Sequence, residues 1–169
     1  VPLAGLSATN DSPTPLGSQT LLEAAVTAGT NVSYSWDLGD GTHGSGVQVQ
    51  HIYPTTGIFT AVVTATNSIG QASATTHVTV VDVPIAGLLA ANDSPTWLHS
   101  PTALTATIAE GTNVSYAWSF GDGALAVGAH PQHVYPAVGL YTATVTATNS
   151  VGQASASTLI EITDVPVTG

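Results

Sequence analysis

The sequence predicts an all-β chain folded as two tandem β-sandwich domains of about seven strands each. Apolar and polar residues alternate over short runs that are bounded by Gly, Pro, Asn and Asp, and no helical period persists. The string that begins at Val1 also starts again, without a gap, at Val83, and more than half of the aligned positions are identical. We therefore assign residues 1–82 and 83–164 to two domains and interpret residues 165–169 as the start of a further repeat.

The first copy shows the expected strands in order, and the second repeats them. Residues 3–9 are predicted as an edge strand, because Pro2 lacks the amide hydrogen that an inner strand needs. Turn residues at 10–13 precede a second strand around Leu22. Residues 32–38 alternate again and form a third strand.

The second half of each copy contains the longest alternating run. The tight turn Gly39-Asp40-Gly41 ends the third strand. Residues 42–50 differ most between the copies and predict a loop or an irregular short strand. A strand over 59–66, a hairpin at 67–70 and a closing strand over 71–80 complete the domain.

The junction between the copies has no Gly/Ser-rich spacer. The closing strand runs through residues 78–83 directly into the first strand of the next copy, and Pro84 stiffens the connection. We expect a tandem array joined in this way to behave as a semi-rigid rod.

Both copies carry one distinctive motif set. The first has Trp36-Asp37-Leu38-Gly39-Asp40-Gly41, His51-Ile52-Tyr53-Pro54 and Gly57-Ile58-Phe59-Thr60. The second has Trp118-Ser119-Phe120-Gly121-Asp122-Gly123, His133-Val134-Tyr135-Pro136 and Gly139-Leu140-Tyr141-Thr142. This set resembles the polycystic kidney disease (PKD) domain over essentially the whole chain, twice.

The resemblance implies an immunoglobulin-like β-sandwich of the PKD type, found in extracellular or cell-surface proteins. The motif residues then have structural roles: the histidines are packed and hydrogen-bonded, and the Trp and Tyr side chains belong to the core. These residues are Trp36, Asp40, His51 and Tyr53 in the first copy, and Trp118, Asp122, His133 and Tyr135 in the second.

The charge of the chain excludes several partners. It has no Lys and no Arg, ten Asp plus Glu and six His, with a formal net charge of −10. Such a chain does not suit nucleic acid or an anionic membrane. No run approaches the ~18 apolar residues of a membrane span, so this segment is not expected to insert. Without Cys the domains must rely on their cores rather than on a disulfide.

The surface composition favours self-association or glycan attachment. Charged residues are 6% of the chain, where about 25% is typical of soluble domains. Thr, Ser, Asn and Gln take their place, and their hydroxyls and amides can bond to a neighbouring copy or carry glycans. Adaptation to an acidic habitat, or resistance to proteases that cut after Lys or Arg, explains the same composition.

A calcium site is implied by the resemblance, because some PKD-like domains bind calcium near the Gly-Asp-Gly turn and the N-terminal loop. Ca²⁺ takes about six to eight oxygen ligands. The alternative is that Asp40 and Asp122 bond to N–H groups of their own turns. Ser119 replaces Asp37 in the second copy, which weakens an equivalent site there. The matching positions are Asn10, Asp11, Asp37, Asp40 and Asp82, with Asn92, Asp93 and Asp122 in the second copy.

Four asparagines match the glycosylation pattern Asn-x-Ser/Thr. Asn10 and Asn92 precede Asp-Ser-Pro and favour a role in turn formation. Asn31 and Asn113 lie between a loop and a strand and are the better acceptors. Trp97, which replaces Pro15 of the first copy, is the one aromatic residue without a core explanation and marks a candidate contact.

No catalytic constellation is visible, so we do not expect an enzyme. We expect a non-catalytic extracellular structural repeat, part of a semi-rigid rod, surface layer or fibre. Its partners would be further copies of itself, and glycans or cell-surface polysaccharide. Two alternatives stay open: a spacer or substrate-binding accessory module of a secreted hydrolase, and the stalk of a cell-surface adhesin. No cofactor other than calcium is indicated.

Overall fold

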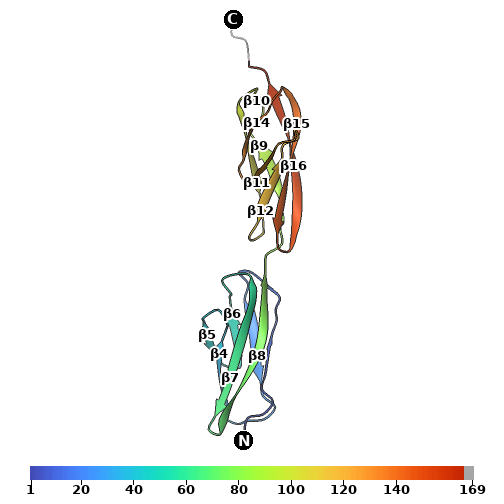
Figure 1. The fold of residues 1–169 in the computed structure, drawn as a ribbon. Coiled ribbons are helices and arrows are strands. Elements are labelled where there is room, and N and C mark those ends of the chain that lie inside the picture. Colours follow the sequence, from blue (N-terminus) through green and yellow to red (C-terminus); the bar gives the residue numbers. More distant parts are fainter. Residues whose placement is uncertain (166–169) are drawn as a thin grey trace. The chain divides into compact units, whose positions relative to one another are not determined.

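The computed structural model describes residues 1–165, and these form two all-β units without a helix (Figure 1). The first unit is Val1–Val81, and the second begins at Asp82. Each unit contains a three-stranded and a five-stranded sheet, and this observation confirms the predicted β-sandwich class. Residues 166–169, which make up most of the further repeat expected from residue 165, lie outside the described part.

The first domain has eight strand segments, one of them only two residues long. The three-stranded sheet has the order β1-β3-β6, with β1 at Ser7–Asn10, β3 at Thr20–Ala25 and β6 at Gln48–His51. The five-stranded sheet has the order β2-β8-β7-β4-β5. Its strands are β2 (Thr14–Pro15), β8 (Gly70–Val81), β7 (Gly57–Asn67), β4 (Ser33–Asp37) and β5 (His43–Ser45).

The second domain repeats this topology. Its three-stranded sheet has the order β14-β11-β9, from β14 (Gln132–Val134), β11 (Pro101–Thr107) and β9 (Leu89–Asn92). The five-stranded sheet has the order β10-β16-β15-β12-β13. Its strands are β10 (Thr96–Trp97), β16 (Gly152–Thr163), β15 (Gly139–Asn149), β12 (Ser115–Ser119) and β13 (Leu125–Val127).

Strand direction is antiparallel in both domains except at one place in each. The two-residue strand β2 runs parallel to the end of β8, with Thr14 opposite Val80. In the second domain β10 pairs in the same way with β16, with Thr96 opposite Ile162. These short pairs attach the N-terminal part of each domain to its last strand.

The core of each domain lies between its two sheets. Trp36 and Leu22 of the first domain are 2% and 0% exposed, and they come from opposite sheets. The indole Nε1 of Trp36 donates a hydrogen bond to the carbonyl oxygen of Gly46 at 3.1 Å. Along β7 every second residue from Ala61 to Ala65 is buried, as the sequence alternation predicts.

The N-terminal strand is shorter than the prediction over residues 3–9. Only Ser7–Asn10 is a strand, and Ala4 makes an isolated bridge with Ala28. The interruption is at Gly5, whose φ is +59° and whose added Cβ would lie 2.2 Å from the Thr27 hydroxyl oxygen. The left-handed backbone at this close approach cannot continue a strand.

Residues 42–50 form two short strands that belong to different sheets. β5 closes the edge of the five-stranded sheet beside β4, while β6 pairs with β3 in the other sheet. Gly46, with a φ of +107°, lies between them. The chain changes sheets here, and this short crossing brings the end of β6 near the turn that follows β4.

The two glycines of the Gly-Asp-Gly turn have different requirements, and this difference gives a first prediction. A Cβ on Gly39 would lie 2.4 Å from the Thr60 carbonyl oxygen, whereas nothing lies within 4 Å of one on Gly41; both have positive φ. We expect Gly39→Ala to destabilise the first domain by several kcal/mol and Gly41→Ala by about 1–2 kcal/mol. Urea denaturation with amide hydrogen exchange will measure both effects. Equal losses would contradict the steric argument.

Candidate functional site

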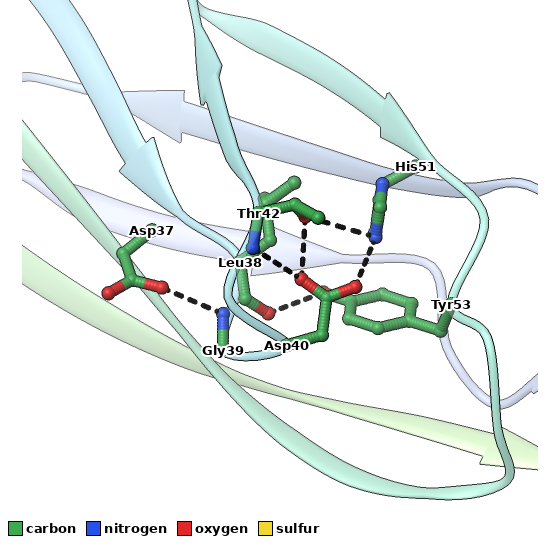
Figure 2. A network of polar contacts seen from close by, with 7 residues as sticks. All are labelled: Asp37, Leu38, Gly39, Asp40, Thr42, His51 and Tyr53. Atoms are coloured by element: carbon green, nitrogen blue, oxygen red, sulfur yellow. Dashed lines mark hydrogen bonds and ion pairs between the residues drawn. The ribbon is translucent and has the colours of Figure 1, made fainter.

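A cluster of polar side chains in the first domain surrounds the carboxylate of Asp40 (Figure 2). Asp40 lies in the turn between β4 and β5, which is closed by the bond from the Leu38 amide to the Thr42 carbonyl at 3.0 Å. The Thr42 amide and hydroxyl donate to Asp40 Oδ1 at 3.0 and 2.6 Å. The Nε2 of His51 bonds to Asp40 Oδ2 at 2.7 Å.

This cluster connects the two sheets of the domain. His51 ends β6 in the three-stranded sheet, whereas Asp40 follows β4 in the five-stranded sheet. The buried Tyr53, two residues after His51, donates its hydroxyl to the Leu38 carbonyl oxygen at 3.0 Å. The rings of His51 and Tyr53 meet edge to face at 4.6 Å. The turn is therefore held from two directions by side chains of one segment.

The electrostatics of the cluster fix the protonation of its members. Burial, the largest single influence, acts to raise the pKa of Asp40, but hydrogen bonds from Thr42 and His51 outweigh it and lower the pKa to about 2. An ionised carboxylate only accepts hydrogen bonds, so the Nε2 of His51 carries the hydrogen. Burial, with the charge of Asp40, raises the pKa of Tyr53 to about 12, which keeps its hydroxyl a donor.

The second domain contains the same cluster with two changes. Asp122 accepts bonds from the Ala124 amide at 3.0 Å and from His133 Nε2 at 2.7 Å, but Ala124 has no hydroxyl to replace that of Thr42. His133 stacks on Phe120 with ring centroids 4.3 Å apart. Tyr135 donates to the Phe120 carbonyl at 3.1 Å. Burial acts to raise the pKa of Asp122, but the hydrogen bonds from His133 and the Ala124 amide outweigh it, so the pKa lies below its ordinary value.

The oxygens of the positions matched to a calcium site are engaged in local hydrogen bonds. Asn10 bonds to Thr76, to the His77 carbonyl and to the Ser12 amide, and Asn92 makes the equivalent bonds. The exposed Asp11 and Asp37 each accept one backbone amide, that of Leu21 and that of Gly39. Asp93 accepts the amide of Ala103 in the same way as Asp11 accepts that of Leu21.

These side chains are not assembled into one centre. Among residues 1–165, no group of three or more His, Cys, Asp or Glu side chains could hold a metal ion. Asp82 belongs to the second unit and the other first-copy positions to the first. The geometry gives each carboxylate a local structural partner, and calcium binding stays a prediction from the resemblance.

Asp82 has the most fully satisfied carboxylate of the second domain. It is 3% exposed. Its Oδ1 accepts the Thr112 hydroxyl at 2.8 Å and the Asn113 amide at 2.6 Å. Its Oδ2 accepts the Ser150 hydroxyl at 2.5 Å and, more weakly, the Ser150 amide at 3.4 Å. The bonds from Ser150 and Thr112 lower the pKa of Asp82 below its ordinary value.

The four candidate glycan acceptors differ in burial and backbone conformation. Asn10 and Asn92 are half-buried and hold turns through both ends of their amides. Asn31 and Asn113 are exposed and adopt left-handed backbone with φ of +52° and +51°. The amide of Asn113, however, already donates to Asp82.

The exposed apolar residues of strand β13 were not foreseen from the sequence. Leu125 and Val127 are 76% and 81% exposed at the edge of the five-stranded sheet, where the first domain has His43 and Ser45. Trp97 on β10, at the opposite edge of that sheet, is 54% exposed. The replacement of polar by apolar residues at corresponding positions was the available signal. Variation between the copies is, however, equally typical of a loop.

Fold and cluster together define the class: tandem immunoglobulin-like β-sandwiches whose Gly-Asp-Gly turn is bound by a His-x-Tyr-Pro segment. The model of the PKD domain matches residues 5–80 and again residues 89–162. The chain belongs to the PKD domain family.

Two polycystins are similar in sequence to this chain. Human Polycystin-1 is 34% identical over 146 residues, which are 85% of this chain and 3% of that protein. Polycystin-1-like protein 1 of Oryzias latipes is 33% identical over 145 residues, which are 80% of this chain and 5% of that protein. The chain thus spans a small fraction of the length of these curated relatives.

Solved structures of immunoglobulin domains share the fold. The amphioxus IgVJ-C2 molecule aligns with a TM-score of 0.57 at 15% identity, over 88% of this chain and 98% of that one. The N-terminal four Ig domains of Dscam1 isoform 6.9 align with a TM-score of 0.53 at 19% identity, over 88% and 42%. Within the part that the structure describes, no helix is long and apolar enough to cross a membrane.

The Asp40 cluster predicts a specific acid sensitivity. Because the folded pKa is lowered from 3.8 to about 2, its stabilisation is complete above about pH 4 and is lost as the pH falls through about 2. We expect a contribution on the order of 1 kcal/mol, since solvent screens part of the effect. NMR titration of the Asp40 carboxyl carbon, together with melting temperatures from pH 2 to 7, will measure it.

The two domains provide a matched pair of variants for the same cluster. Thr42→Ala removes the extra hydroxyl, so it should raise the pKa of Asp40 and cost the first domain about 1 kcal/mol at neutral pH. Ala124→Thr should lower the pKa of Asp122 and stabilise the second domain. NMR titration and urea denaturation of both variants will test this. Unchanged carboxyl pKa values in both would show that the hydroxyl does not tune the carboxylate.

Proposed function

We propose that the chain is a non-catalytic extracellular structural or adhesion module, a pair of repeats that forms part of a semi-rigid rod, surface layer, fibre or stalk. Family membership supports the extracellular setting and the module class. The alignment with Polycystin-1 runs over 146 residues, so the similarity extends over more than one domain of this chain.

The junction is the observation that carries the proposal of a rod. Val81 is the last residue of β8, and its carbonyl accepts the Leu16 amide of the first unit at 2.8 Å. The next residue, Asp82, is held by Thr112, Asn113 and Ser150 of the second unit. The adjacent residues Val81 and Asp82 are therefore each hydrogen-bonded within their own domain. A junction without a flexible spacer supports limited reorientation of the domains.

The polar motif residues also favour a structural role over a catalytic one. Asp40, His51 and Tyr53 direct their functional groups at one another and at the Leu38 backbone. A nucleophile or general base needs a group that can reach a substrate. In this cluster those groups hold a turn.

Distance distributions across the junction will test the stiffness. The chain has no native cysteine, so spin labels at Thr55→Cys and Ala137→Cys, both exposed positions, report one inter-domain distance. We expect a narrow distribution in the otherwise unchanged chain. A Gly-Ser-Gly-Ser insertion between Val81 and Asp82 should broaden it, while the same insertion after Ser18, in the exposed turn at residues 17–19, should not. A distribution already broad without the insertion would exclude the rod.

Electron microscopy of the native secreted material will separate the assembly classes. Filaments with an axial repeat of one or two domains support the fibre or surface layer. Only short particles without ordered polymer would favour the spacer of a secreted hydrolase.

The binding-module alternative has one specific observation in its favour, the exposed Trp97 on the edge strand β10. Exposed aromatic side chains can stack on sugar rings, and the first domain has Pro15 at this position. Sedimentation with insoluble cell-wall polysaccharide will test it. Binding that is lost in Trp97→Pro, the residue of the first domain, would support this function, and equal binding by both proteins would exclude Trp97 as the contact.

A further inference from the structure

The carboxylate of Asp82 is bound by a set of groups that all donate hydrogen bonds. They are the Thr112 hydroxyl, the Asn113 side-chain amide, and the hydroxyl and backbone amide of Ser150. The Thr112 oxygen in turn accepts the amide of Val83 at 2.8 Å. The buried carboxylate is thus paired on both oxygens by neutral donors, which can stabilise it where no Lys or Arg is available.

The first domain carries the same three residues at the corresponding positions: Thr30, Asn31 and Ser68. Their backbone is arranged in the same way. Asn31 has a φ of +52° and Asn113 a φ of +51°, so both side chains leave the turn from the same left-handed backbone conformation. Asn is one of the few residues with a side chain that adopts this conformation readily.

The N-terminal segments of the two domains are also placed alike. The Val1 nitrogen donates to Thr30 Oγ1 at 2.9 Å, as Val83 does to Thr112 at 2.8 Å. The Asn67 amide binds the carbonyls of Val1 and Thr30 at 2.9 and 3.3 Å. The Asn149 amide binds those of Val83 and Thr112 at 2.8 and 3.1 Å. A residue joined to Val1 therefore leaves from the same point as Asp82.

We propose that Thr30, Asn31 and Ser68 form a binding site for the side-chain carboxylate of an aspartate placed directly before Val1. The site is the counterpart of Thr112, Asn113 and Ser150 around Asp82. It selects a carboxylate over an amide, because an Asn side chain at that place would turn its NH₂ group toward donors. The sequence Asp-Val-Pro, which occurs at 82–84 and again at 164–166, is the ligand motif.

The site also changes the interpretation of the two better glycosylation candidates. The amide nitrogen of Asn113 donates to Asp82 Oδ1 at 2.6 Å, and the proposal assigns the Asn31 amide nitrogen to the same bond. This nitrogen is the atom to which an N-linked glycan would be attached. Carboxylate binding therefore engages the same nitrogen that glycosylation would modify, and we expect the two to compete at these asparagines.

Three extended forms of the two-domain chain will test the proposal. Each carries Gly-Ser-Xaa before Val1, with Xaa as Asp, Asn or Ala, so the terminal ammonium is equally distant in all three. The melting of each domain is followed separately through its NMR amide signals. We expect the Asp form to raise the melting temperature of the first domain by roughly 5 °C over the Ala form, with no change in the second. The Asn form should gain less than half of this.

A double-mutant background keeps the test independent of general stability. In Asn31→Gly/Ser68→Ala, which retains the left-handed backbone, the difference between the Asp and Ala forms should disappear. NMR titration should place the carboxyl pKa of the added Asp below its ordinary value in the unmutated chain only. Equal melting of the Asp, Asn and Ala forms, or an Asp effect that persists in the double mutant, would overturn the proposal.

Asp82 serves as the internal reference. Asp82→Ala should lower the melting temperature of the second domain and leave the first unchanged. If Asp82→Ala and Asp82→Asn both have the melting temperature of the parent chain, the hydrogen bonds to Asp82 do not stabilise the second domain. The proposed site of the first domain, which is inferred from them, would then be overturned as well.

Discussion

The lack of any Lys or Arg is the constraint on which the polar structure of this chain depends. Carboxylates in most proteins are stabilised in part by basic side chains, and here they must be stabilised by neutral donors and by histidine. Asp11 and Asp93 accept backbone amides across a strand pair, Asp40 and Asp122 accept histidine, and Asp82 accepts hydroxyls and an amide. Each such carboxylate fixes one turn or one connection.

Comparison of the two domains shows which parts of the design tolerate change. Trp36 and Trp118, or Tyr53 and Tyr135, keep the same burial and the same hydrogen-bond partners. The core changes only in side-chain size, as where Leu38 becomes Phe120 and Val78 becomes Ile160. Changes of polarity lie at the surface, where Thr42 becomes Ala124 and the polar β5 becomes the apolar β13. The domains therefore share one internal architecture and present different edges to their surroundings.

The fold was predictable because its signals are local. Two-residue alternation identified the β7 and β8 strands, and the hairpin between Asn67 and Gly70 followed from its turn residues. The interruption at Gly5, which delays the start of β1 to Ser7, was not predictable, because it depends on the approach of Thr27, far along the chain. The change of sheets at Gly46 was hidden for the same kind of reason, since strand partners decide it.

The identities of the site residues were predictable from the sequence, but their contacts in space were not. The repeat made Asp40, His51 and Tyr53 conspicuous, but spacing alone could not show that they meet across the two sheets. Asp82 was placed by the sequence at the end of the first copy, whereas its hydrogen bonds are all to residues after Val83. Those partners lie about thirty and seventy positions away along the repeat, beyond the reach of local pattern reasoning.

In each domain, the segment that contains the first short strand pair runs parallel to the last strand and is hydrogen-bonded to it, and we call this row of bonds the parallel seam. The seam has a mechanical consequence. Residues 10–16 are hydrogen-bonded to β8 in parallel order. Asn10 bonds to Thr76 and His77, Ser12 to Thr79, and Leu16 to Val81. The second domain repeats the seam between Asn92 and Leu98 along β16. Tension applied through the two ends of a domain pulls these parallel segments in opposite directions along their length. This tension loads all hydrogen bonds of the seam at the same time, in shear, and does not open them one after another. Resistance to stretching is then set by the rate at which the whole seam breaks, not by the equilibrium stability of the sandwich.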